Sequence, residues 1–222
     1  MKNILPRKMD DYYRRVYMLK ILHETLHSHR IDPDKLERIL DLGCGNGYWL
    51  RILADLRGRS SGCFGTEIDL ARLEQSLAVN PGIAVLSADH RTLPFKEGQF
   101  DLVTDFVSFH FLLQDNDLSA ACSEVYRILK PGGWFLSFEV VDPDHRSDVS
   151  RFFHPDRYCE IFRNCNFSLL EQRTVFRKFK LFKKHHTAYL ASVLHPALVM
   201  LLDEFCPLPH SPTNKLFLFQ KA

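Results

Sequence analysis

The sequence predicts an α/β fold in which a doubly wound, mostly parallel sheet is covered by helices. Short apolar runs alternate with segments of helical spacing over residues 36–141, which is typical of parallel strands joined by crossover helices. A glycine-rich turn follows the first run, and acidic residues stand at the ends of the next two. Because such sheets bind ligands at the carboxyl ends of their strands, the pattern predicts a binding site at that edge.

Length and composition are those of an ordinary globular protein. The 222 residues are 45% hydrophobic and 25% charged, so a single domain over 1–222 is expected. A net charge of +2 argues against a stable nucleic-acid complex. Six scattered cysteines form no C-x-x-C pair and no zinc spacing, which favours reduced thiols, no metal site and a cytoplasmic location. No secretory signal or membrane-spanning run is expected.

The stretch from Ile39 to Leu50 organises the chain. A short apolar run, interrupted by Asp41, is followed by glycines at three alternate positions, and helical spacing begins at Tyr48. Alternate glycines let the backbone approach a ligand closely because no Cβ stands in the way. The following helix offers its free N–H groups to an electron-rich group. We therefore expect a strand, a cofactor-binding turn and a helix.

The spacing of these glycines departs from the dinucleotide fingerprint. In G-x-G-x-x-G the third glycine lies three residues after the second, whereas Gly47 lies only two after Gly45. The shorter spacing, with Asp41 inside the strand, suits a pyrophosphate poorly. An NAD-linked oxidoreductase is therefore a distant alternative.

The remaining elements are expected in regular order. Residues 1–35 are assigned to an N-terminal cap with a helix over 10–29, residues 36–141 to the cofactor-binding core, and residues 142–222 to a substrate-side insertion and C-terminal strands. Lys130–Gly133 reads as a helix stop and a turn. Further helices are predicted at 48–56, 70–79, 119–129, 155–164 and 187–205, and strands at 39–42, 63–69, 83–86, 100–107, 134–141, 167–175 and 215–221.

Three acidic residues stand at successive strand ends. Asp41 ends the first strand, Glu67 the second, and Asp89 follows the third. Glu67 can accept hydrogen bonds from both hydroxyls of a ribose, Asp89 can accept one from an exocyclic amine, and Asp41 would lie near an ammonium group. Three convergent carboxylates would repel a pyrophosphate. They suit a cationic ligand that carries ribose, adenine and amino groups.

The chain resembles the class I, Rossmann-like S-adenosylmethionine-dependent methyltransferases, of the small-molecule type related to quinone-biosynthesis methyltransferases. The resemblance spans Ile39 to about Val141. Its motifs are I-L-D-L-G-C-G-N-G from Ile39, F-G-T-E-I-D from Phe64, S-A-D-H-R-T-L-P-F from Ser87, F-D-L-V-T-D-F-V-S-F-H-F from Phe100, and L-K-P-G-G-W-F-L-S-F-E from Leu129.

The resemblance implies S-adenosylmethionine as the cofactor and a seven-stranded sheet whose last strand, over 215–221, is antiparallel. The glycine turn would line the methionine moiety, the end of the second strand the ribose, and the end of the third the adenine. The backbone after the fourth strand would close the site. The implied cofactor-binding residues are Asp41, Gly43, Cys44, Gly45, Glu67, Ile68, Asp89, His90, Asp105 and Phe106.

His110 is the candidate catalytic residue. Transfer to a hydroxyl or a carbon acid needs a general base, and in similar methyltransferases a histidine often stands after the fourth strand. A capping or packing histidine between Phe109 and Phe111 is the alternative. Glu139, Asp142 and Asp144 read as a polar loop after the fifth strand rather than as acceptor contacts.

A small-molecule or lipid-like acceptor is expected. Lysines and arginines interleave with phenylalanines after Val175, and an apolar stretch follows, so residues 173–202 could contact a membrane surface peripherally. A strand with a solvated basic face is the simpler alternative. An RNA or protein methyltransferase and a catalytically inactive cofactor-binding partner also stay open, although no N-P-P-Y or D-P-P-Y motif follows the fourth strand. The sequence leaves the oligomeric state undetermined.

Overall fold

The computed structural model describes residues 4–141, 150–179 and 210–222, with side chains over 15–141, 150–175 and 214–222. The chain divides into two compact units, each described by itself: one holds residues 1–31 and 174–214, the other 32–173 and 215–222. The expectation of one methyltransferase domain over 1–222 stays a prediction.

The first unit contains the helix α1, Ile4–Ser28. The predicted N-terminal helix is confirmed, and it begins six residues earlier than expected. Buried side chains recur at helical spacing at Met18, Ile21, Leu22 and Leu26, as one apolar stripe requires. Most of the proposed membrane-contacting segment, residues 180–202, lies outside the described residues, and so do Asp142 and Asp144.

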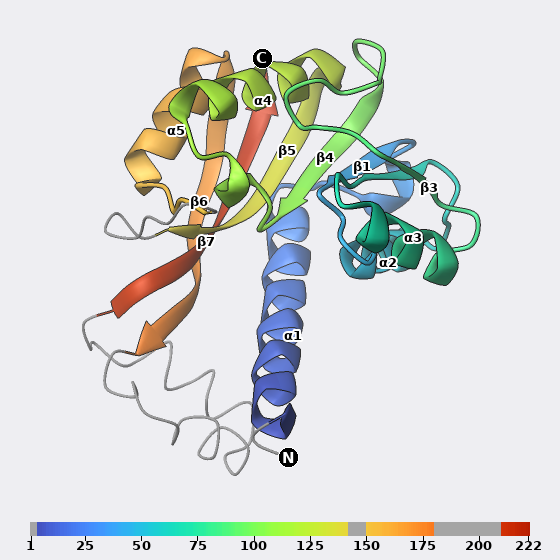
Figure 1. Cartoon of the computed structure of the whole chain (residues 1–222). Helices are drawn as coiled ribbons and strands as arrows, with labels where there is room; N and C mark the ends of the chain where they lie inside the picture. The colour runs from blue at the N-terminus through green and yellow to red at the C-terminus, as the bar shows by residue number, and fades with distance from the viewer. Residues whose placement is uncertain (1–3, 142–149, 180–209) are drawn as a thin grey trace. The chain divides into compact units, whose positions relative to one another are not determined.

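The sheet has seven strands in the order β3-β2-β1-β4-β5-β7-β6, as Figure 1 shows. The first five strands pair in parallel, and β7 runs opposite to its two neighbours, β5 and β6. The predicted fold class is therefore confirmed. The strands are β1 (Ile39–Leu42), β2 (Cys63–Thr66), β3 (Ala84–Leu86), β4 (Phe100–Phe106), β5 (Leu129–Val141), β6 (Phe167–Phe179) and β7 (His210–Lys221).

Helices pack on this sheet through two hydrophobic clusters. The larger cluster joins buried residues of α4 (Asp115–Ile128) and α5 (Pro155–Asn164) to strands β1, β4, β5 and β7. The smaller one joins Leu50 and Ala54 of α2 (Tyr48–Leu56) to the region of β2 and β3, with Leu73 of α3 (Leu70–Val79) against it. All four helices were predicted, although α4 begins four residues earlier than expected.

One predicted turn is wrong. Lys130–Gly133 lies within β5, which begins at Leu129 directly after α4. The register explains this, because Phe100 pairs with Leu129 and Leu102 with Trp134. The intervening residues form an irregularity in which Gly132 has a φ of +73°. The Pro-Gly-Gly sequence therefore bends a continuous strand instead of preceding it.

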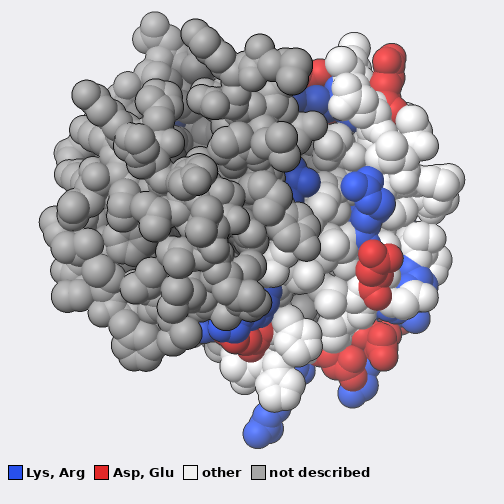
Figure 2. All heavy atoms as spheres, turned by 90° about the horizontal axis from the view of Figure 1, so that it is seen from below, with Lys and Arg blue, Asp and Glu red and all other residues white. Residues whose placement is uncertain are grey.

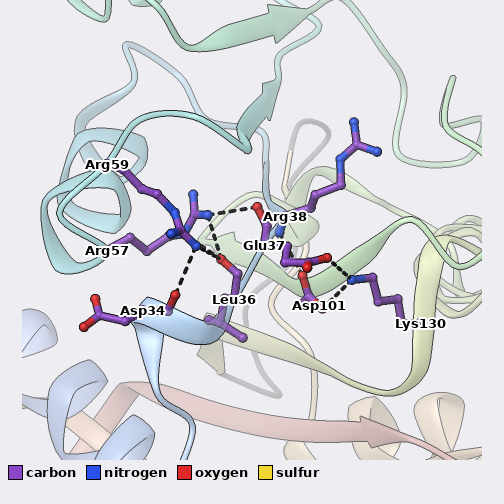
Figure 3. A network of polar contacts seen from close by, with 8 residues as sticks. All are labelled: Asp34, Leu36, Glu37, Arg38, Arg57, Arg59, Asp101 and Lys130. Atoms are coloured by element: carbon purple, nitrogen blue, oxygen red, sulfur yellow. Dashed lines mark hydrogen bonds and ion pairs between the residues drawn. The ribbon is translucent and has the colours of Figure 1, made fainter.

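The amino ends of β1 and β2 are tied together by a buried arginine. Arg57, only 3% exposed, donates from Nε and Nη2 to the Leu36 carbonyl at 3.0 and 2.6 Å, and from Nη2 to the Glu37 carbonyl at 2.8 Å. Its Nη1 donates to the Ser61 carbonyl at 2.9 Å. Figure 3 shows the guanidinium facing the backbone that enters β1. The contacts fix β1 in place and so fix the glycine turn that follows it.

A second set of contacts connects β4 and β5 to the amino end of β1. Lys130 lies 3.0 Å from Glu37 and 2.8 Å from Asp101, while the amide of Arg38 donates to Asp101 at 2.8 Å. Figure 3 shows these side chains beside the Arg57 contacts. This network lies at the opposite end of the strands from the predicted site, so we assign it a structural role.

The described surface carries mixed charge. Figure 2 shows one face on whose described part basic and acidic side chains are interspersed. The expectation that the protein forms no stable nucleic-acid complex stays a prediction. Within the described part of the chain, none of the helices is both long and apolar enough to cross a membrane.

We predict that Arg57→Met destabilises the protein by about 2–4 kcal/mol, because it leaves buried carbonyl groups without donors. Arg59→Met is the matched control: Arg59 is exposed and contacts the same backbone at 3.0 and 3.2 Å, so we expect a loss of less than about 1 kcal/mol. Urea unfolding followed by circular dichroism measures both. Equal losses would contradict the role given to Arg57.

Candidate functional site

The glycine turn lies at the carboxyl end of β1, and two of its glycines are required for different reasons. Gly43 has a φ of +60°, and a Cβ there would lie 2.5 Å from the Cβ of Ser108, so only glycine lets β1 and the turn after β4 approach. Gly45 has a φ of +56°, and a Cβ there would meet nothing within 4 Å. Gly45 therefore faces open space that a ligand can enter.

Cys44, between these glycines, turns its side chain away from that space. Its thiol packs into the cluster with Leu50, where a Cβ on Gly65 would lie 2.8 Å from its sulfur. Burial raises the pKa of the thiol to about 12. The backbone amide of Cys44 donates to the Thr66 carbonyl at 2.9 Å. The predicted cofactor contact of Cys44 is thus restricted to its backbone.

Glu67 binds the glycine turn to the end of β2. Its Oε2 accepts from the Gly45 amide at 2.8 Å, and its Oε1 accepts from the amides of Ile68 and Asp69 at 2.8 and 2.9 Å. The residue is 6% exposed. Next to it, Ile68 is 66% exposed, an apolar surface beside a carboxylate. The structure therefore places Glu67 and Ile68 together at the predicted edge.

Asp41 is buried in β1, 1% exposed. Its Oδ1 accepts from the Thr104 hydroxyl at 2.9 Å, whereas its Oδ2 is buried without a hydrogen-bond partner in the described structure. Burial raises the pKa of this carboxyl well above its ordinary value, and the charges of Asp105 and Glu67 add to the increase. Asp105 and Glu67 are thus close enough to Asp41 to influence the pKa of its carboxyl group.

Asp89 and His90 follow β3. Asp89 pairs with Arg91 at 2.6 Å, and the hydrogen bonds from Arg91 lower its pKa. His90 lies with its Nε2 3.2 Å from the Ser108 hydroxyl, and burial lowers the pKa of its imidazole. The Nδ1 of His90 is buried without a partner in the described structure. His90 therefore reaches the turn after β4, while the Asp89 carboxylate is engaged by Arg91.

A buried polar network that the sequence analysis missed lies at the ends of β4 and β5. Asp105 accepts from the amide and the hydroxyl of Ser108 and, at 3.0 Å, from the hydroxyl of Ser137. Ser137 in turn lies 2.9 Å from the hydroxyl of Tyr158. Hydrophobic neighbours in the sequence give no signal that these groups converge.

The prediction that Glu139 belongs to a polar loop is wrong. Glu139 lies within β5 and is 0% exposed, and it accepts from the Phe109 amide at 2.8 Å. Burial, together with the neighbouring charge of Asp105, raises the pKa of Glu139 well above its ordinary value of 4.5. Residues 135–139 of β5 are all buried, so both faces of this strand are covered, which explains why this acid is buried.

Phe106 presents an aromatic surface at the end of β4. Its ring stacks on that of Trp49, with centroids 4.2 Å apart and planes within 7°, and it also stacks on Phe138 at 5.2 Å. Trp49 lies in α2 and was not among the site residues predicted from the sequence. Its position two residues after Gly47 was the available signal, because the start of α2 lies at the strand ends.

His110 lies in the short helix η2, Phe109–Phe111. Its Nδ1 is 3.9 Å from Glu139 Oε2, and its side chain is 13% exposed. The ring contacts that of Phe111 at 4.0 Å. Phe111 and the nearby Leu113 are 56% and 39% exposed. The predicted base thus lies at the carboxyl end of the sheet, beside exposed apolar side chains. Among the described residues, no group of His, Cys, Asp and Glu could hold a metal ion.

The raised pKa of Glu139 predicts a pH-dependent stability. The folded protein keeps this proton at pH values where the unfolded chain has lost it, so Glu139 lowers stability as the pH rises above about 4.5. Glu139→Gln removes this loss. We expect its melting temperature relative to wild type to increase between pH 5 and pH 8, as scanning fluorimetry would measure.

The control is Glu74→Gln, which changes an exposed carboxyl on α3. It should show no such trend. A difference between Glu139→Gln and wild type that is constant over this pH range would contradict the protonated state of Glu139.

Comparisons with known proteins agree with this geometry. Residues 40–137 match the family described as "Methyltransferase domain". The human protein named arginine-hydroxylase NDUFAF5, mitochondrial, is 40% identical over 107 residues, which are 47% of this chain and 29% of that protein. The demethylmenaquinone methyltransferase of Lactococcus lactis subsp. lactis is 31% identical over 110 residues, or 47% of this chain and 42% of that protein.

A solved structure shares the fold. The putative sarcosine dimethylglycine methyltransferase from Galdieria sulphuraria superposes with a TM-score of 0.69 at 17% identity, over 93% of this chain and 86% of that one. The chain spans less than half the length of the two curated relatives described above. Its family match, its fold and the strand-end residues agree, and the chain therefore carries a class I methyltransferase domain whose cofactor is S-adenosylmethionine.

Proposed function

We propose that this protein transfers the methyl group of S-adenosylmethionine to a small, apolar or lipid-like acceptor. The observation that carries the proposal is the exposed apolar pair Phe111 and Leu113 directly after His110, at 56% and 39% exposure. Exposed large apolar side chains next to a polar group of low exposure are typical of ligand sites. The similarity to a demethylmenaquinone methyltransferase supports an acceptor of this class.

Asp41 supports the cofactor side of the proposal. A buried carboxylate oxygen without a donor is costly, and Asp41 Oδ2 is one in the described structure. The ammonium group of the cofactor's methionine part would supply the missing donor. Such a contact favours the ionised carboxylate and offsets the cost of its burial. The residues of the site therefore fit S-adenosylmethionine.

Glu67 and Ile68 would hold the nucleoside. The Glu67 carboxylate has about four acceptor positions, three of which are used by backbone amides, so it can still accept from a ribose hydroxyl. Ile68 offers an exposed apolar surface for the flat face of the adenine. Asp89 would accept a hydrogen bond from the exocyclic amine of the adenine while its carboxylate also keeps a contact with Arg91.

The chemistry then needs little from the protein beyond alignment. The cofactor supplies an already activated methyl group, and the protein positions the acceptor in line with it and excludes water. For a hydroxyl or carbon-acid acceptor, His110 would take the proton as the nucleophile forms. Its low exposure beside Phe111 keeps the imidazole in a partly dry environment.

Other functions predict different products. The likeness to a protein named arginine-hydroxylase supports a second candidate, hydroxylation of an arginine side chain, which would need an added oxidant such as O2 as the source of the oxygen atom and would leave S-adenosylmethionine unconsumed. An RNA or protein methyltransferase would release S-adenosylhomocysteine only with those polymers. An inactive binding partner would bind the cofactor and release none. Incubation with reduced demethylmenaquinone, RNA and arginine-containing peptides, followed by mass spectrometry, separates these cases.

We predict that Glu67→Ala weakens S-adenosylmethionine binding by about tenfold or more, because hydrogen bonds to a charged acceptor contribute roughly 1.5–3 kcal/mol. Isothermal titration calorimetry measures the affinity, and circular dichroism confirms the fold. Glu74→Gln, on the surface of α3, should bind normally. An unchanged affinity in folded Glu67→Ala would refute the role of Glu67.

The His110→Gln variant should keep its affinity for the cofactor and lose about 100-fold or more in the rate of methyl transfer to an acceptor that must be deprotonated. Release of S-adenosylhomocysteine from the protein with reduced demethylmenaquinone measures the rate. His23→Gln changes an exposed histidine on α1 and serves as the control. A full rate in His110→Gln would show that no base is used at this position.

A further inference from the structure

The turn that follows β4 contains a strained residue. Val107 has a φ of +63°, in the left-handed region that β-branched side chains adopt rarely and at a cost. A backbone of this kind persists only where its surroundings hold it. The turn comprises Phe106 to Phe109 and leads directly into His110, so its conformation determines where the candidate base lies.

Three backbone amides of the turn are fixed by specific acceptors. The Val107 amide donates to the Phe138 carbonyl at 2.8 Å. The Ser108 amide donates to Asp105 Oδ1 at 3.0 Å, and the Phe109 amide donates to Glu139 Oε1 at 2.8 Å. Two of these acceptors are side-chain carboxyl groups, each 0% exposed. The turn is therefore held by a pair of buried acids.

Further contacts fix the side chains of the two acids. Ser108 and Ser137 donate their hydroxyls to Asp105, and the Val140 amide donates to Glu139 Oε2 at 3.3 Å. The two carboxyl groups that accept from the turn are therefore themselves held in place.

Glu139 reaches His110 as well as the backbone. Its Oε2 lies 3.9 Å from His110 Nδ1, on the same side chain whose Oε1 binds the preceding amide. The His110 carbonyl accepts from the Arg151 amide at 2.7 Å, so the residue is held on both sides.

We propose that Asp105 and Glu139 are positioning residues, which together hold the turn at Val107 in its left-handed form and so direct His110 toward the methyl acceptor. The inference rests on the proposed function for the role of His110. The contacts that hold the turn do not depend on methyl transfer. The structural role of the two acids and the role of His110 in methyl transfer can therefore be tested separately.

Two variants of Glu139 test the holding of the turn. Glu139→Gln resembles the acid in shape and keeps an oxygen that can accept from the Phe109 amide. Glu139→Leu has a similar volume and offers no acceptor. We expect hydrogen exchange at the Phe109 amide, followed by NMR, to be about 100-fold or more faster in the Leu variant and near wild type in the Gln variant. The Val103 amide in the middle of β4 is the internal control.

Val107→Gly provides a rescue. Glycine adopts a positive φ without strain, so the turn needs less holding when Glu139 is absent. The double variant Glu139→Leu, Val107→Gly should therefore show a smaller increase in Phe109 exchange than Glu139→Leu alone. Two outcomes would overturn the proposal. Either the two changes have independent, multiplicative effects on the exchange rate of the Phe109 amide, or this rate is unchanged in Glu139→Leu. In both cases the turn would be held by the packing of Phe109.

Kinetics then test the consequence for His110. With reduced demethylmenaquinone as the probe, Glu139→Leu should lose roughly 100-fold in kcat through misplacement of the base, while cofactor affinity measured by calorimetry stays unchanged and Glu139→Gln stays near wild type. A Gln variant as slow as the Leu variant would contradict the proposal. If wild type releases no S-adenosylhomocysteine, the proposed function fails, and the exchange experiment still decides whether the acids hold the turn.

Discussion

The Glu67 carboxylate connects the parts of the cofactor site. One oxygen accepts from the Gly45 amide in the turn after β1, and the other accepts from the two amides that follow β2. A single side chain thereby fixes the distance between two strand ends, and Gly45 keeps an open face because its Cβ position is empty. The free surface of the turn and the exposed side chain of Ile68 depend on that connection.

Burial of acids is the main electrostatic cost at the carboxyl ends of the strands. Asp41, Asp105 and Glu139 are at most 1% exposed, and the pKa of Asp41 and that of Glu139 are both raised by burial. Each acid has different partners: Asp105 accepts from two hydroxyls, and Glu139 accepts from the Phe109 amide. Asp41 keeps one oxygen without a donor in the described structure. A cationic ligand would offset this cost, whereas a pyrophosphate would add to it.

Much of this account could be predicted from the sequence. Alternating apolar runs and helical segments predict a doubly wound, mostly parallel sheet, and acids at strand ends indicate the site, because both depend on local patterns. Glu139 could not be predicted as buried, since its inward direction depends on the register of β5 against β4. The strain at Val107 and the stacking of Trp49 on Phe106 likewise depend on contacts between distant segments. Lys130–Gly133 was misread because the same residues can end a helix or bend a strand.

We expect the strand-end carboxylates to bind S-adenosylmethionine through its ammonium group and ribose. A crystal structure of the protein with S-adenosylhomocysteine tests this most directly. We predict that the ligand's ammonium nitrogen lies within hydrogen-bond distance of Asp41 Oδ2, with a ribose hydroxyl against Glu67 and the adenine against Ile68. A ligand bound elsewhere, or one whose ammonium group makes no contact with Asp41 while that carboxyl stays buried, would contradict it.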